Sequence, residues 1–228
     1  MFGTVAGWAQ TDPGVVFPIK QVSVSSPVQQ EIITNMRVKE GDVVKAGDVV
    51  VELRKEREEL DVLLSQKLIE LKRFTARGKQ RLFKEEMGSE EQALEAKTDL
   101  ELAELQLKAK EIALKEKTIL SPIDGTVVKK YKETGESVSR EEKLLDIVNL
   151  DRVVVRFNLP VQLRQSLKPQ ATVTVKVTDL NGAEFSGKIV FVDPRNDPAS
   201  NKVPVWVELE NKEHRIAPGM RATGDFGK

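Results

Sequence analysis

The chain has 228 residues, of which 39% are hydrophobic, and its 36 basic side chains balance its 36 acidic ones. This composition supplies enough apolar side chains for folded domains, and the balanced charge creates no field that draws the protein to nucleic acid. There is no cysteine, which excludes disulfides, thiolate metal sites and cysteine nucleophiles.

Two copies of one short β motif flank the middle of the chain. The first copy begins at residues 26–33 (SPVQQEII) and continues to 38–44 (VKEGDVV), and the second begins at 121–128 (SPIDGTVV) and continues to 132–138 (KETGESV). Because a motif of this size cannot bury its apolar face alone, the two copies are expected to close on each other. The segment between them must then leave the domain and return to it.

The first β half is predicted over residues 21–53, where short apolar runs alternate with turn signals at Gly41 and Gly47. Residues 1–20 come before it. They are expected either to contribute to the β-barrel predicted at the other end of the chain or to belong to a membrane-proximal part that the sequence lacks.

Residues 54–117 predict a long helical hairpin. No proline occurs between residues 28 and 121, and 30 of these 64 residues are charged, as expected of solvated helices with a narrow buried stripe. The predicted stripe of the first helix consists of Leu60, Leu64, Leu68, Leu71, Phe74 and Leu82. That of the second helix follows a coiled-coil spacing through Ala93, Ala96, Leu100, Ala103, Leu107 and Leu114.

The hairpin tip is predicted at residues 87–90. Gly88 is expected to end the first helix in the left-handed conformation, which glycine adopts without strain. Ser89 and Gln92 have the spacing of a capping box, in which the two side chains bind backbone N–H groups at the start of the second helix.

The rest of the chain again predicts β structure. The second β half covers residues 118–150, and residues 151–228 predict a small closed or nearly closed barrel. Its strands are expected near 152–158, 171–178, 184–192, 203–209 and 220–226, with one short helix from Pro160 to about Leu167.

The sequence contains few residues that could catalyse a reaction or bind a cofactor. His214 is the only histidine and lies in a polar segment, so a solvated loop residue is favoured over a metal ligand or catalytic base. No glycine-rich phosphate loop and no nucleophile elbow occur. The sequence therefore predicts a protein that is not an enzyme and holds neither a cofactor nor a metal.

The order of these segments resembles the periplasmic adaptor subunits, or membrane fusion proteins of the HlyD type, of bacterial efflux and secretion systems. The resemblance covers about residues 20–228 and rests on residues 38–50 (VKEGDVVKAGDVV), 120–128 (LSPIDGTVV) and 217–222 (APGMRA). It implies a mainly β fold with a long α-helical coiled-coil hairpin, built from a split biotinyl/lipoyl-like sandwich and a small β-barrel.

The resemblance also implies a function and a location. Such an adaptor connects an inner-membrane transporter, either proton-driven or of the ABC type, to an exit duct, with an outer-membrane channel as an optional partner. It self-associates into a trimer or hexamer and lies in the periplasm, held at the inner membrane by a signal or anchor that this chain does not contain.

Family members that dock to an outer-membrane channel carry Arg, Leu and Ser around the hairpin tip. Leu82 and Ser89 match the spacing of the last two, whereas Gly78 stands at the arginine position between Arg77 and Arg81. The partner-binding residues expected at the tip are Leu82, Gly88, Ser89 and Glu90. The expected hinges between segments are Leu53, Lys117, Leu150 and Asp151.

Two alternatives belong to other functional classes. A lipoyl- or biotin-type carrier of an enzyme complex needs a lysine on an exposed tight turn, but the 64-residue excursion occupies that position, and Lys45 lies in an earlier turn. The second alternative is a free-standing coiled-coil interaction scaffold of the cytoplasm.

Overall fold

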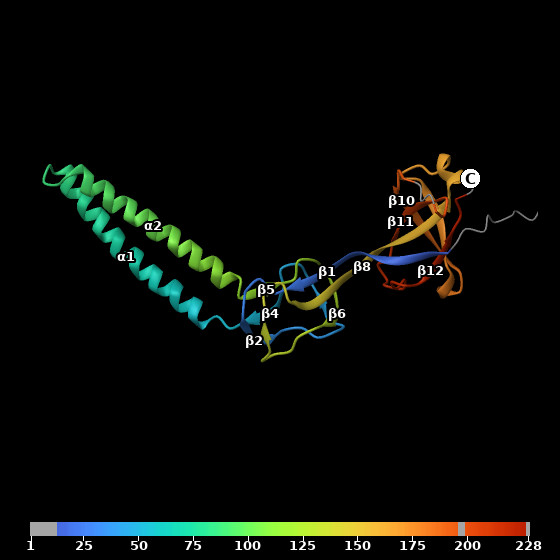
Figure 1. Ribbon diagram of the computed structural model, residues 1–228, viewed down its shortest axis with the longest axis horizontal. Coiled ribbons are helices and arrows are strands. Elements are labelled where there is room, and N and C mark those ends of the chain that lie inside the picture. The colour runs from blue at the N-terminus through green and yellow to red at the C-terminus, as the bar shows by residue number, and fades with distance from the viewer. Residues whose placement is uncertain (1–12, 196–198, 227–228) are drawn as a thin grey trace, which may run out of the picture.

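The computed structural model describes residues 13–195 and 199–226, and these form an elongated molecule with three parts in a row. A helical hairpin lies at one end, a β-sandwich in the middle and a β-barrel at the other end (Figure 1). Residues 1–12, which make up most of the predicted N-terminal segment, lie outside the described part of the chain.

The sandwich consists of two facing sheets that contain strands from both copies of the repeated motif. One sheet has the order β5-β4-β2-β7, and the other contains β3, β6 and parts of β8 and β1. The bounds are β1 Gly14–Ser25, β2 Glu31–Met36, β3 Val43–Val44, β4 Val49–Leu53, β5 Thr118–Leu120, β6 Gly125–Lys130, β7 Ser137–Val138 and β8 Lys143–Pro160. As expected, the two β halves pack around one apolar core, which includes Ile33 from the first half and Val127 from the second.

The two halves use the same tight turn, twice each. In every turn an acidic side chain accepts a hydrogen bond from the backbone N–H three residues earlier, and the residue just before the acid has a positive φ. These acids are Asp42, Asp48, Glu136 and Glu142. Glycine fills the positive-φ position in three of the turns and Glu141 in the fourth, so the repeat extends to the level of single hydrogen bonds.

The barrel closes because a strand from before the sandwich joins it. Strands β12, β9, β10, β11 and β8 are hydrogen-bonded in that order, and β1 pairs with both β12 and β8. The remaining bounds are β9 Thr172–Val177, β10 Ala183–Val192, β11 Lys202–Glu210 and β12 Arg221–Gly224. Each predicted barrel strand has a counterpart, and the predicted short helix is the 3-10 helix Val161–Gln165. A second 3-10 turn covers Thr178–Leu180.

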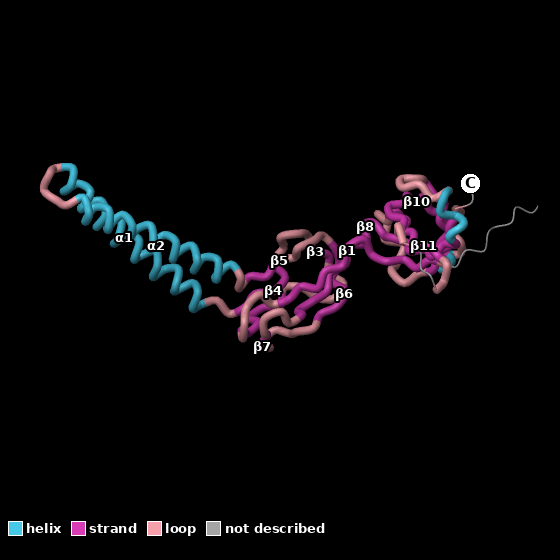
Figure 2. The backbone as a smooth tube through the Cα atoms, turned by 45° about the horizontal axis from the view of Figure 1, so that its top comes forward, coloured by secondary structure: helices cyan, strands magenta, loops and turns pink. Residues whose placement is uncertain are grey.

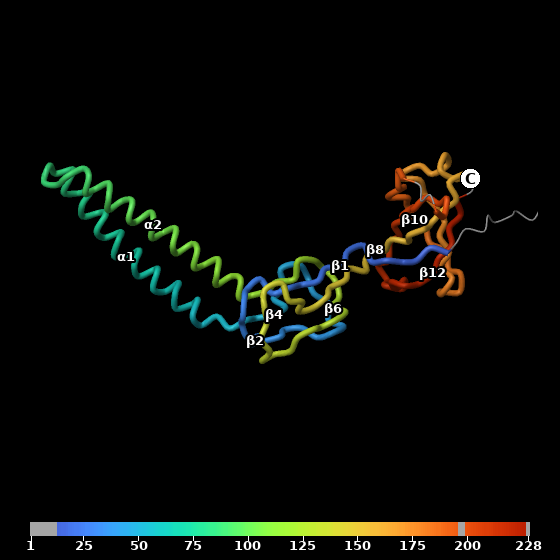
Figure 3. The backbone as a smooth tube through the Cα atoms, viewed as in Figure 1, coloured from blue at the N-terminus to red at the C-terminus, as the bar shows by residue number. Residues whose placement is uncertain are grey.

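Strands β1 and β8 run through both the sandwich and the barrel as one antiparallel ribbon, visible in blue and yellow in Figure 3. The pairing register shifts between Pro18, opposite Val153, and Lys20, opposite Asn149, so β8 bulges at residues 150–152. Both strands therefore cross the boundaries predicted at residues 20 and 150. The two β parts are joined by paired strands instead of a loop.

The hairpin consists of α1, Glu56–Lys84, and α2, Glu90–Lys115, and Figure 2 shows both helices projecting from the sandwich. The stripe predicted for α1 is wrong. Its six members, Leu60, Leu64, Leu68, Leu71, Phe74 and Leu82, are all exposed, by 37–79%. The buried residues of α1 are Ile69 and Ala76, on another side of the helix, because polar residues such as Lys72 share the inner face and form ion pairs with α2.

The inner face of α2 agrees better with its prediction. Ala96 and Ala103 are buried, and Ala93, Leu100, Leu107 and Leu114 are half-buried. The buried residues of each helix are seven positions apart, and alanine lets the helices approach closely. The spacing predicted for the inner face therefore agrees with the structure on α2. On α1 the large leucines lie on an exposed face instead.

The first testable prediction concerns Gly125, at the start of β6. A Cβ atom at this position would lie 2.5 Å from the backbone oxygen of Val148, in the paired strand β8. Because backbone cannot move aside cheaply, we expect Gly125→Ala to lower the free energy of unfolding by about 1–3 kcal/mol, as overpacking does. Urea unfolding followed by circular dichroism measures the change.

Gly78→Ala is the matched control, because a Cβ atom there meets nothing within 4 Å. Within α1 this exchange should stabilise the helix by about 0.5–1 kcal/mol. Equal stability of Gly125→Ala and the wild type would show that the β6–β8 pairing has more room than the structure indicates.

Candidate functional site

The hairpin tip begins where α1 ends in a Schellman motif. The N–H of Glu86 donates to the carbonyl of Phe83 at 3.0 Å, and that of Met87 donates to the carbonyl of Leu82 at 2.8 Å. Glu86 carries the left-handed conformation of this motif, with a φ of 58°. The prediction that Gly88 takes this role is therefore wrong.

Gly88 is needed for a different reason. A Cβ atom on it would lie 3.2 Å from both the Cβ of Leu82 and the backbone nitrogen of Phe83. The tip thus folds back onto the last turn of α1, and glycine permits the close approach. Gly88 and Leu82, both expected at the partner-binding tip, are neighbours in the structure.

Ser89 is the N-cap of α2, with the extended backbone typical of that position, but its side chain makes no capping hydrogen bond. Gln92 instead accepts a hydrogen bond from the ammonium group of Lys79 at 2.9 Å. The expected capping box is therefore not formed. The Ser89 hydroxyl is exposed at the tip beside Glu90, which begins α2.

Large apolar side chains surround these residues. Leu82, Phe83 and Met87 are exposed by 37%, 40% and 74%. Met87 lies within the predicted tip, but neither Met87 nor Phe83 was among the residues predicted to bind a partner, although the sequence shows both apolar residues beside a turn of charged residues. The arginine of the docking pattern is absent at Gly78, but Arg77 and Arg81 lie on the same helix one residue before and three after.

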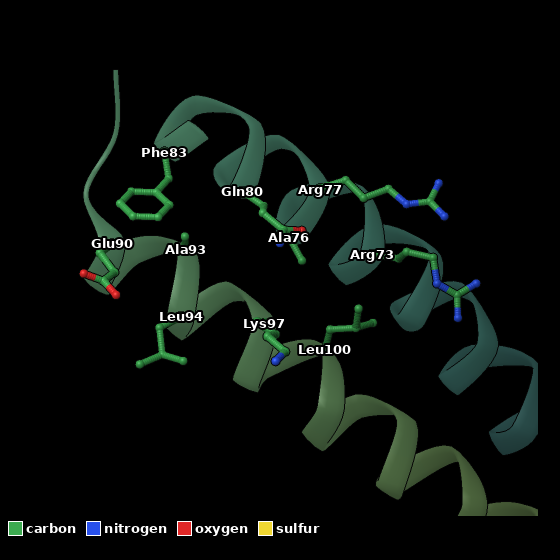
Figure 4. Close-up of a pocket in the computed structure, with 10 residues that line it drawn as sticks. All are labelled: Arg73, Ala76, Arg77, Gln80, Phe83, Glu90, Ala93, Leu94, Lys97 and Leu100. Carbon is green, nitrogen blue, oxygen red and sulfur yellow. The ribbon is translucent and has the colours of Figure 1, made fainter. Parts of the chain in front are cut away.

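Below the tip, a groove of about 450 Å³ runs between the two helices. Its floor contains Ala76, Ala93 and Leu100, and Phe83 closes its upper end (Figure 4). Arg73 and Arg77 project from the same side of α1 at its rim. The groove follows from the small residues of the inner faces, which leave space where larger side chains would fill it.

The base of the hairpin is held by a buried cation. The ammonium group of Lys117 lies 2.6 Å from Glu31 of β2 and 3.0 Å from Glu58 of α1, and its side chain is only 9% exposed. Burial alone would raise the pKa of Glu31. The hydrogen bond from Lys117 and the nearby Lys117 and Arg54 charges outweigh it and lower that pKa. Lys117 therefore ties the sandwich to both helices.

The four predicted hinge residues are all well bonded. Leu53 is fully buried at the end of β4, and its N–H donates to the carbonyl of Lys117 at 2.8 Å. Leu150 and Asp151 lie inside β8, at its bulge, and their carbonyls accept hydrogen bonds from Asn211. None of the four lies in an open linker, so any bending at these points has to act through paired strands.

His214 lies beside one of these residues. Its Nε2 atom is 3.0 Å from the carboxylate of Asp151, and this hydrogen bond is the main cause that lowers the pKa of Asp151. Among residues 13–195 and 199–226, no group of three or more potential ligands is placed to hold a metal. In the same part of the chain, no helix is long and apolar enough to span a membrane.

The second prediction concerns Lys117. Lys117→Met leaves Glu31 and Glu58 without their buried cation, and we expect it to lower the free energy of unfolding by about 2 kcal/mol at neutral pH. Arg54→Met is the matched control, since it removes an exposed partner of the same Glu31 and should cost less than about 1 kcal/mol. Urea unfolding of both variants gives the comparison.

The pH dependence gives a second readout of the same contact. Because the pKa of Glu31 is lowered from 4.5 on folding, its contribution is present above that value and is lost as the pH falls below it. The pKa of Lys117 is raised above 10.5, so its contribution is lost only as the pH rises above that value. As the pH is lowered, the free energy of unfolding of Lys117→Met should therefore fall less than that of the wild type. An unchanged acid profile would contradict the proposed contact.

The families that the chain matches divide it at the same place as the fold, between the part with the sandwich and hairpin and the barrel. Residues 20–150 match the family model "RND MFP, barrel-sandwich hybrid domain", and residues 152–228 match "CusB-like, beta-barrel domain". The nodulation protein NolF of Rhizobium meliloti is 27% identical over 93% of this chain. The chain spans 62% of the length of NolF.

Solved structures show the same fold. A MacA-MexA chimeric protein containing the Pseudomonas aeruginosa MexA α-hairpin domain gives a TM-score of 0.82 at 24% identity, covering 93% of this chain and 78% of its own. The membrane fusion protein Spr0693 from Streptococcus pneumoniae R6 gives 0.75 at 16% identity, covering 92% and 95%. Since one family model alone covers more than half of the chain, the protein belongs to the membrane fusion protein family, the non-catalytic adaptors of efflux systems.

Proposed function

We propose that the protein is a periplasmic adaptor that links an inner-membrane transporter to an outer-membrane exit duct. The observation that carries this proposal is the separation of two exposed ends by one continuous scaffold. The tip lies at one end of the molecule and the barrel at the other (Figure 1). The β1–β8 ribbon and the Lys117 contacts connect the parts between them.

In this proposal the hairpin provides reach. The 29 residues of α1 extend roughly 40 Å at 1.5 Å per residue. The helices pack as a short coiled coil, which the seven-residue spacing of Ile69 with Ala76 and of Ala96 with Ala103 supports. Cross-helix ion pairs from Lys72 to Asp99 and from Lys110 to Asp61 hold the two arms side by side.

The barrel end would face the transporter and the inner membrane, and the tip would contact the duct through Leu82, Gly88, Ser89 and Glu90. The exposed Phe83 and Met87 extend this surface. Apolar side chains presented at a tip, with polar groups beside them, are typical of a protein contact. Copies of the adaptor, in a trimer or hexamer, would surround the path of the substrate, and the energy for transport would come from the transporter.

Bending would occur at the bulge of β8 near Leu150 and Asp151. A bulge changes the direction of a paired strand without breaking the sheet. The contacts of Lys117 and Leu53 instead favour a stiff base for the hairpin. We therefore propose one bending point, between the sandwich and the barrel.

The third prediction tests the tip. Ser89→Asp adds a charge to the duct contact yet keeps a good N-cap residue, whose negative charge suits a helix N-terminus. We expect it to reduce export at least tenfold in a strain that depends on this adaptor, because an unpaired charge at such a contact costs more than about 1.4 kcal/mol. Leu82→Glu should act in the same way.

Gln29→Glu is the control, since it adds one negative charge to an exposed turn of the sandwich, away from the tip. Circular dichroism and protein levels should match the wild type for all three variants. If folded Ser89→Asp and Leu82→Glu proteins export normally, the tip has no part in docking.

A further inference from the structure

The two helices leave a hollow on each side of their contact in the half of the hairpin near the tip. The larger, of about 450 Å³, is the groove in Figure 4, and a smaller one of about 250 Å³ lies on the other side of the contact. The volume of the groove lies within the range of roughly 300–1,000 Å³ that is typical of sites for small molecules. The two hollows differ in how their charged groups are satisfied.

The smaller hollow is closed by polar contacts between the helices. The ammonium group of Lys79 donates a hydrogen bond to Gln92 at 2.9 Å, and that of Lys72 forms an ion pair with Asp99. Its charged lining is balanced, because Glu95 and Asp99 match the two lysines. The basic groups of this side therefore have acceptors on the other helix.

The larger groove has an excess of positive charge. Three basic residues line it against one acidic residue, Glu90, which lies at the upper end near Phe83 (Figure 4). The basic residues are Arg73 and Arg77 from α1 and Lys97 from α2. All three lie toward the other end of the groove, so its two ends differ in charge.

The chain satisfies these three cations unequally. Arg73 forms an ion pair with Glu104 at 3.2 Å. Lys97 is 3.8 Å from Glu101 on its own helix, which is too far for a strong hydrogen bond. Within residues 13–195 and 199–226, Arg77 forms no ion pair and no side-chain hydrogen bond.

The alignment of the helices explains why Arg77 has no partner. Lys79 lies level with Gln92, to which it is bonded. Arg77 is two residues further from the tip, and in an antiparallel hairpin it therefore lies level with Leu94, two residues further along α2. Where the other side of the contact has an acceptor, this side has an apolar side chain that is 62% exposed.

Between these charged groups the groove is apolar. Ala76 is buried in its floor, Ala93 and Leu100 are half-buried there, and Phe83, which closes the upper end, is 40% exposed. An apolar molecule that covers this floor is stabilised by the removal of both surfaces from water. The groove thus combines an apolar floor with a cationic end, the arrangement that suits a molecule with one apolar and one anionic part.

We propose that this groove binds a small amphiphilic molecule that consists of one carboxylate and an apolar chain. The carboxylate lies at the cationic end, where the guanidinium group of Arg77 can bind both of its oxygens. The chain runs over Ala93 toward Phe83, because the charge of Glu90 repels an anion at that end. Arg77 and Phe83 are six residues apart on α1, about 9 Å along the helix axis, so a chain of medium length reaches from one to the other.

The occupant is a single free molecule and not a membrane. The apolar floor is recessed between two helices, where the flat surface of a lipid bilayer does not reach. The site also does not depend on the proposed contact with a duct, although Phe83 belongs to both surfaces. A bound chain covers one side of Phe83 and so lies directly below the tip.

Equilibrium dialysis of the full chain against radiolabelled decanoate, below the concentration at which decanoate forms micelles, measures the binding. We expect saturable binding of one molecule per chain. Decanol has the same chain without the charge, and decyltrimethylammonium has the opposite charge. Both should bind roughly fivefold more weakly or worse, as expected from the loss of an exposed ion pair.

The variant Arg77→Gln tests the cationic end. It should bind decanoate roughly fivefold more weakly and should bind decanol as the wild type does. Lys79→Gln is the matched control, because it removes a cation two residues away on the other side of the helix contact, and its affinity for decanoate should be unchanged. Circular dichroism confirms that the hairpin remains helical in both variants.

The variant Phe83→Ala tests the apolar end by chain length. The wild type should prefer decanoate over hexanoate, since only the longer chain reaches Phe83. In Phe83→Ala this preference should fall by roughly fourfold, the effect of about one buried methylene group. An unchanged preference would show that the chain does not lie along the groove.

Equal affinities for decanoate and decanol, or equal weakening by Arg77→Gln and Lys79→Gln, would overturn the proposal, as would binding that does not saturate. Sedimentation with phosphatidylglycerol vesicles should leave the chain in solution. Sedimentation with the vesicles that Arg77→Gln abolishes would show that the basic residues bind a membrane and would also overturn the proposal. None of these measurements involves export, so their outcome is separate from the test of the proposed function.

Discussion

The backbone hydrogen bond from Leu53 to Lys117 fixes the two ends of the hairpin next to each other. It joins the last residue of β4 to the residue just before β5, which are also paired strands of one sheet. Closing a loop of this length costs conformational entropy, and the pairing of two β halves around a shared core offsets that cost. The buried Lys117 side chain then fixes the direction in which the helices leave.

The same principle operates at the other end of the sandwich. There the chain enters through β1 and leaves through β8, and the two strands stay paired into the barrel. Each part of the molecule is thus connected to the next by two chain segments instead of one. Two paired connections resist twisting better than a single linker, which suits the adaptor role proposed above.

The sequence predicted the fold best where a motif repeats, or where proline and glycine restrict the backbone conformation. The twin motifs, the proline-free middle and the glycine turns predicted the sandwich, the hairpin and the barrel strands. The inner face of α1 could not be predicted in this way, because its leucines formed the larger stripe while alanine and lysine made the contact with α2. Leucine periodicity indicates an apolar face, but it does not say whether the partner belongs to the same chain.

The tip shows the same limit on a smaller scale. Glycine is the usual left-handed residue, so Gly88 was the natural choice, yet a Schellman motif formed two residues earlier around Glu86. Gly88 was needed for its lack of a side chain beside Leu82. A glycine at a turn can be required for a left-handed conformation or for its lack of a side chain. Which of the two applies depends on packing, and local sequence does not reveal packing.

In the proposed function, the tip and the barrel contact different partners at the same time. The chain has no cysteine, so single cysteines can be placed without a background. Met87 at the tip and Lys168, which follows the 3-10 helix at the far end of β8 in the barrel, are both exposed and can each be replaced by cysteine for crosslinking in living cells. We predict that mass spectrometry identifies an outer-membrane channel crosslinked to Met87→Cys and an inner-membrane transporter crosslinked to Lys168→Cys. Recovery of the same partner from both positions, or of the transporter from the tip, would rule out the proposed adaptor role.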